Sequence, residues 1–199
     1  MKDIPVHITI RSAQKIYEPK NKNAGIAAKA YAGEYASNFN DLTELENELK
    51  LTVEECAKDY DDILPFSDNG NGESHIEFTT VGVMRKKNSR VEISYEESEL
   101  TGMEGSTTSL YFSPDEPKAV YMQRKGTVSS NMIFEENSRK SAMYNTGIMP
   151  FRICIATKKV ENSVTLEQGG TLDIVYKMEI NGNLTQANRF NITVKRDDT

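Results

Sequence analysis

Four glutamates lie within nine residues of the sequence, and their carboxylates are side chains that could do chemistry. They are Glu96, Glu97, Glu99 and Glu104. Two carboxylates can act as acid and base when their environments separate their pKa values, and clustered oxygens bind hard cations. Strand alternation, however, sends Glu96 and Glu97 to opposite faces, so they cannot flank one bond. We therefore expect no catalytic residue and no metal ligand here.

Two of these glutamates continue an apolar face. Val91, Ile93 and Tyr95 alternate with polar residues, and the same period of two extends to Glu97 and Glu99. A strand face that carries valine, isoleucine and tyrosine is expected to point into the core, because these side chains are usually buried. Glu97 and Glu99 are therefore predicted to point inward as well.

An arginine and a hydroxyl group fall on inward faces by the same count. Arg124 ends one alternating run of apolar residues, and Ser130 lies within the next. A buried charge is costly, by about several kcal/mol, unless it is paired and hydrogen-bonded. We therefore predict that Arg124 meets Glu97 or Glu99 inside or near one mouth of the fold.

Alternation with a period of two recurs along most of the chain and predicts nine or ten strands. Turn-forming residues separate these strands roughly every ten residues. An antiparallel up-and-down barrel of about 8–10 strands is the simplest closure of such a meander, because closure removes exposed edges. The alternating positions are Val6/Ile8/Ile10, Ile76/Phe78, Val91/Ile93/Tyr95, Val120/Met122, Met132/Phe134, Ile153/Ile155, Val164/Leu166, Leu172 to Ile180 and Phe190/Ile192/Val194.

The segment 17–75 differs from the rest of the chain in charge and in pattern. It holds 13 acidic residues against 5 lysines. Apolar residues recur at helical spacing over 42–63, and Thr43 with Glu46 has the form of a capping box, so we predict a helix there. We interpret 1–199 as a single β-barrel domain, formed by 1–16 and 76–196, with an acidic, partly helical insertion over 17–75 after the first strand.

A longer motif connects this chain to a known family. The stretches 94–108, 124–135, 144–146, 157–159 and 176–181 resemble the signature of the DUF1934 or YwiB-like family of uncharacterised bacterial proteins. The resemblance covers 1–16 and 76–196, and it implies a lipocalin-like (calycin) barrel. This chain departs from the family pattern in the 17–75 insertion and in Gly147-Ile148-Met149, where the family often has Pro-Tyr-Gly. The family has no established activity that could be carried over.

Charge and composition exclude several classes of protein. The net charge is −6, and no basic patch with interleaved aromatic residues occurs, so we expect no nucleic-acid partner. No run of about 18 apolar residues is present, and residues 1–5 are too polar for a signal peptide, which predicts a cytoplasmic protein without a membrane span. Two distant cysteines and two histidines indicate neither a disulfide framework nor a zinc site. No cofactor is indicated.

Two functions from different classes fit these observations. The first is a barrel that binds a small amphipathic or anionic molecule, with Tyr95, Glu97, Glu99, Arg124 and Ser130 as binding residues. The alternative is a non-enzymatic interaction module with a packed barrel, which contacts a partner through its surface and the acidic insertion. An enzyme would need a nucleophile beside a base, and no recognisable spacing provides one. The two leading hypotheses differ in whether the lumen is filled by Met122, Met132, Phe134, Ile153, Ile155, Met178 and Ile180.

Overall fold

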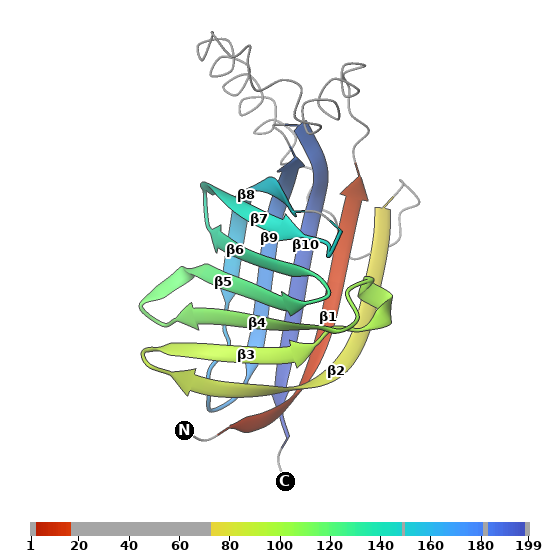
Figure 1. Cartoon of the computed structure of the whole chain (residues 1–199). Helices are drawn as coiled ribbons and strands as arrows, with labels where there is room; N and C mark the ends of the chain where they lie inside the picture. Colours follow the sequence, from red (N-terminus) through yellow and green to blue (C-terminus); the bar gives the residue numbers. More distant parts are fainter. Residues whose placement is uncertain (1–2, 17–72, 149, 181–182, 198–199) are drawn as a thin grey trace, which may run out of the picture.

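Ten antiparallel strands close into one barrel in the computed structural model, which describes residues 3–16, 73–148, 150–180 and 183–197 (Figure 1). Each strand pairs with its neighbours in sequence, and β1 pairs with β10 to complete the ring. The predicted up-and-down barrel is therefore confirmed. The strands are β1 (Ile4–Ile16), β2 (Glu73–Lys87), β3 (Arg90–Glu96), β4 (Ser106–Ser113), β5 (Glu116–Gly126), β6 (Ser129–Glu135), β7 (Ser138–Asn145), β8 (Pro150–Asn162), β9 (Gly170–Ile180) and β10 (Asn183–Arg196).

Alternation along the strands builds the interior. In β9, for example, Leu172, Ile174 and Tyr176 point inward, and Asp173 between them faces outward to Arg189. Directly paired residues share a face, so register places Leu172 beside Ile192 and Ile174 beside Phe190. The inward side chains of neighbouring strands thereby form one hydrophobic core.

Two strands and one loop differ from the predicted pattern. Strands β4 and β7 were not marked by alternation, because their inward faces carry polar residues such as Ser106, Thr108 and Ser138 among the apolar ones. Conversely, the predicted strand at Val164 and Leu166 is wrong. These residues lie in the loop between β8 and β9, which holds one isolated bridge. Strand β2 also begins at position 73 instead of 76.

Helical structure is limited to one turn in the described part of the chain. This is the 3₁₀ helix η2 (Glu99–Thr101), which connects β3 to β4. No helix in the described residues is long and apolar enough to cross a membrane. The predicted helix over 42–63, and the insertion as far as residue 72, lie outside the described residues.

The barrel has two chemically different ends. The polar end surrounds Glu97 and Arg124 and includes η2 and the turn between β5 and β6. The hairpin end surrounds Val91 and Phe112 and includes the hairpin turns β2–β3 and β4–β5 and the loop between β8 and β9. Both chain termini lie at the bottom of Figure 1. There, the backbone N–H of Asp197 donates to the carbonyl of Pro5 at 3.1 Å.

Candidate functional site

The polar end of the barrel contains a cavity of about 530 Å³. Its walls come from strands that are far apart in sequence, because closure places β1 and β2 across the ring from β6 and β7. Most of the lining is apolar, aromatic or methionine. The lining includes Ile10, Ile76, Phe78, Met103, Met122, Met132, Tyr144, Phe151, Tyr176, Met178, Ile180 and Phe190.

A buried ion pair lies in the wall of this cavity. Arg124 donates to Glu97 Oε1 from Nε at 3.2 Å and from Nη2 at 3.1 Å, and both residues are 7% exposed. Thr108 lies between the two charges, since its hydroxyl donates to Glu97 Oε1 at 2.5 Å and accepts from Arg124 Nε at 2.9 Å. The predicted pairing of Arg124 with a motif glutamate is therefore confirmed, and Glu97 is the partner.

Local structure explains why Glu97 turns inward although β3 ends at Glu96. The N–H of Glu97 still donates to the carbonyl of Ser106 at 2.8 Å, which keeps the alternation in phase for one residue more. The chain then enters η2, whose Thr101 hydroxyl lies 3.1 Å from Glu97 Oε2 and 2.7 Å from the carbonyl of Ser98, so that these two acceptors compete for its single proton. Gly102 ends η2 with φ +68°, a left-handed conformation that glycine adopts without strain. Glu97 Oε1 thus accepts from Arg124 and Thr108, and Oε2 shares the Thr101 proton with the backbone of η2.

Two tyrosines complete the polar part of the wall. Burial, together with the nearby Glu97 charge, raises the pKa of the Tyr95 hydroxyl. Burial also raises the pKa of Tyr176 to about 12, against the opposing effect of Arg124. Both hydroxyls therefore remain protonated at neutral pH, and each can donate one hydrogen bond.

The structure brings together three of the five predicted binding residues. Tyr95, Glu97 and Arg124 line the cavity. Ser130 is buried and pairs with Arg124 across β5 and β6, but it does not line the cavity. The prediction that Glu99 points inward is wrong, because η2 breaks the strand alternation and leaves Glu99 exposed on the surface.

Sequence reasoning missed Asn188 and the bridging Thr108. Asn188 is 7% exposed and lines the cavity, and its Nδ2 finds no hydrogen-bond partner in the described part of the chain. The alternation of Phe190 and Ile192, counted two residues back along β10, would have placed Asn188 on the inward face. Thr108 was not predicted to point inward because alternation did not predict β4 as a strand.

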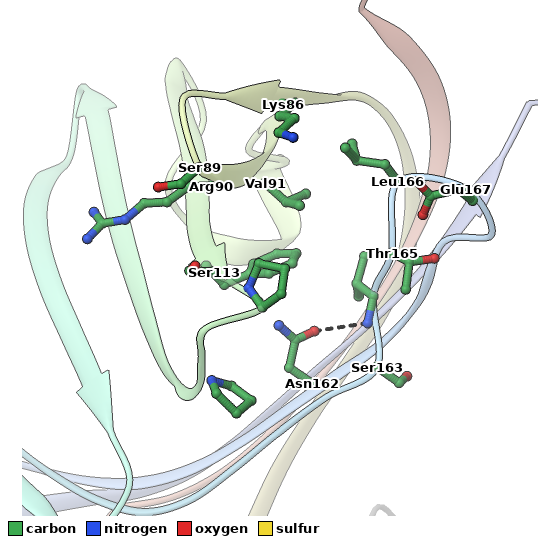
Figure 2. Close-up of a pocket in the computed structure, with 14 residues that line it drawn as sticks. Lys86, Ser89, Arg90, Val91, Ser113, Asn162, Ser163, Thr165, Leu166 and Glu167 are labelled. Atoms are coloured by element: carbon green, nitrogen blue, oxygen red, sulfur yellow. Dashed lines mark hydrogen bonds between the residues drawn. The ribbon is translucent and has the colours of Figure 1, made fainter.

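A second cavity, of about 420 Å³, lies at the hairpin end (Figure 2). Several of its polar side chains are bonded to the backbone that surrounds it, namely those of Ser113, Asn162, Ser163 and Thr165. Asn162 Oδ1 accepts from the N–H of Val164 at 3.0 Å, as the dashed line in Figure 2 shows. Ser163 Oγ accepts from the N–H of Thr171 at 3.0 Å and donates to its carbonyl at 3.1 Å. These side chains hold the loop between β8 and β9 in place.

The remaining motif glutamates do not converge. Glu96 and Glu104 are both exposed, and Glu96 accepts a hydrogen bond from Thr107 on the outer face at 2.8 Å. Among the described residues, no group of three or more His, Cys, Asp or Glu side chains is placed to hold a metal ion. The chemistry at the polar end is therefore that of hydrogen bonding and apolar contact around one ion pair.

Comparison with known proteins agrees with this architecture. A family described as "Domain of unknown function (DUF1934)" matches residues 66–192, more than half of the chain. The crystal structure of the ywiB protein from Bacillus subtilis is similar, with a TM-score of 0.60 and 18% identity, and the alignment covers 98% of this chain and 92% of that one. At this identity the likeness shows a shared fold. No curated protein matches the sequence. The chain belongs to the DUF1934 family.

Proposed function

We propose that the barrel binds a small amphipathic molecule in the cavity at its polar end. The observation that carries the proposal is a buried polar side chain, Asn188, that borders an interior cavity and lacks a partner for its Nδ2 among the described residues. An unsatisfied buried amide is destabilising by about 1–3 kcal/mol, and a ligand with an acceptor group would remove that penalty. The apolar wall would hold the body of the same ligand.

The distribution of side chains in the lumen supports this choice over the interaction module. Met122, Met132, Met178 and Ile180 border the cavity as well as packing in or against the hydrophobic core, whereas Phe134, Ile153 and Ile155 belong to the core and do not line the cavity. The lumen is thus filled along only part of its length. The interaction hypothesis assumed a barrel that is packed throughout.

Native mass spectrometry of the full chain as isolated from cells, compared with its denatured mass, tests the proposal. We expect a reproducible extra mass that is lost in Arg124→Met. Lys125→Met is the matched control, because Lys125 is the next residue of β5 and is exposed on the outside. Asn188→Leu provides a second variant that keeps the ion pair and removes the unpaired amide.

Three results would contradict the proposal. The first is a chain that carries no extra mass, which would favour the interaction module. The second is an extra mass that persists in both Arg124→Met and Asn188→Leu. The third is its loss in the Lys125→Met control, because a residue outside the barrel should not affect an interior ligand.

A further inference from the structure

We infer that the ligand of this cavity is electrically neutral and presents hydrogen-bond acceptors to the wall, as a carboxamide, ester or ketone on an apolar body would. This inference rests on the proposed function and narrows the class of ligand. An inward arginine by itself would also suggest an anionic ligand. Three features of the cavity carry it: its charge balance, the donors that are left over, and the apolar lining.

The charge of the wall is already balanced. Among the described lining residues, the charged side chains are Glu97 and Arg124, one of each sign. Their closest contact is a hydrogen-bonded ion pair of 3.1 Å from Nη2 to Oε1, so the carboxylate neutralises the guanidinium at short range. An anionic ligand would add a buried charge without a counterion, and burial of such a charge is strongly unfavourable.

The groups that remain open are hydrogen-bond donors. Arg124 uses Nε and Nη2, and its Nη1 has no hydrogen bond to the described residues. Asn188 Nδ2 also lacks a partner there. Glu97 Oε1, in contrast, already accepts from both Arg124 and Thr108. Arg124 and Asn188 therefore lack acceptors, and a neutral ligand with carbonyl oxygens would supply them.

The rest of the wall fits an apolar ligand body. Methionines from β5, β6 and β9 line the cavity together with aromatic rings from β2, β7 and β8. Methionine side chains are flexible and polarisable, so they adapt to a ligand's shape, and aromatic rings contribute large contact areas. A ligand that joins this apolar volume to the donors of Arg124 and Asn188 needs a polar head and an aliphatic or aromatic body.

Decanamide and decanoate at pH 7.5 are matched probes, because they share an alkyl chain and differ in the charge of the head group. We expect isothermal titration calorimetry of the full chain to show at least tenfold tighter binding of decanamide. In Glu97→Gln the guanidinium loses its counterion, so the preference should move at least tenfold toward decanoate. Glu96→Gln is the control, because Glu96 is the adjacent residue on the outer face.

The outcomes separate the inference from the proposed function. If decanoate binds the unmodified protein more tightly, the inference is wrong and the cavity remains a ligand site. If neither probe binds, the proposed function itself is contradicted. A preference that shifts equally in Glu96→Gln and Glu97→Gln would also overturn the inference. The comparison of the two probes on the unmodified chain needs no variant, so the test holds even if Glu97→Gln does not fold.

Discussion

The two ends of the barrel each contain a cavity, and they differ in what their polar groups do. At the hairpin end, Asn162 and Ser163 form hydrogen bonds to the backbone of their own loop. At the polar end, Arg124 and Asn188 retain donors that no described residue accepts from. The volumes, about 420 and 530 Å³, are similar. The state of the buried polar groups, and not the size of the cavity, is therefore what marks one end as a candidate binding site.

The ion pair at the polar end should give the largest effect on stability. Glu97→Gln and Arg124→Met each leave one buried charge unpaired, and we expect each to lower the free energy of unfolding by about 3–5 kcal/mol. The double variant removes both charges and should lose no more than either single variant. Urea unfolding followed by circular dichroism measures all three. Additive losses in the double variant would show that the two residues do not interact.

Methionines at the two ends offer a matched comparison of packing. Met84 is fully buried in the core, whereas Met132 borders the cavity. We expect Met84→Ala to lower the free energy of unfolding by about 3 kcal/mol and Met132→Ala by about 1.5 kcal/mol, because fewer atoms surround Met132. The same urea titration measures both variants. Equal losses would mean that the polar end is packed as densely as the core.

Glu92 of β3 forms an ion pair on the outer face of the barrel, and it tests how much less an outward ion pair contributes to stability than the inward pair of Glu97 and Arg124. Glu92 faces outward and accepts from Arg85 Nε at 2.8 Å and from the Tyr111 hydroxyl at 3.0 Å. These hydrogen bonds, chiefly that from Arg85, hold the pKa of Glu92 below its usual 4.5 despite its burial. Its contribution to stability is therefore complete above about pH 4.5 and is lost as the pH falls through the lowered pKa.

Glu92→Gln should accordingly lower the free energy of unfolding by about 1.5 kcal/mol at pH 7. The difference from the unmodified chain should shrink as the pH falls through the lowered pKa of Glu92, because the carboxyl of the unmodified chain then loses its charge. Urea unfolding at a series of pH values measures this. A difference that stays constant across the series would show that the Glu92 charge is not what stabilises the fold.

The smallest expected effects compare single hydrogen-bonding groups at the two ends. Asn162→Ala removes a satisfied side chain and should lower the free energy of unfolding by about 1 kcal/mol. Ser130→Ala removes a buried hydroxyl that has no partner in the described residues, so its effect should stay within about 0.5 kcal/mol. The midpoints of urea unfolding of the two variants, each compared with the unmodified chain, measure the difference between the two losses of stability. A larger loss for Ser130→Ala would indicate that its hydroxyl is bonded in solution.

Short-range patterns were enough to predict much of the fold. Alternation predicted most of the strands, the barrel and the inward direction of Glu97 and Arg124, because a strand sends every second side chain to the same face. The pattern failed where inward residues are polar, as with Thr108 in β4, and where the chain leaves the strand, as at Glu99 in η2.

The sequence by itself determined which side chains of each strand point into the barrel, since that depends on a local period of two. Only the tertiary structure decided which of them meet. Register and closure bring Thr108 between Glu97 and Arg124, and they place Asn188 of β10 on the wall of the same cavity. Packing volume across the lumen also decided where the two cavities lie. These contacts join residues from distant strands, and a local period carries no information about them.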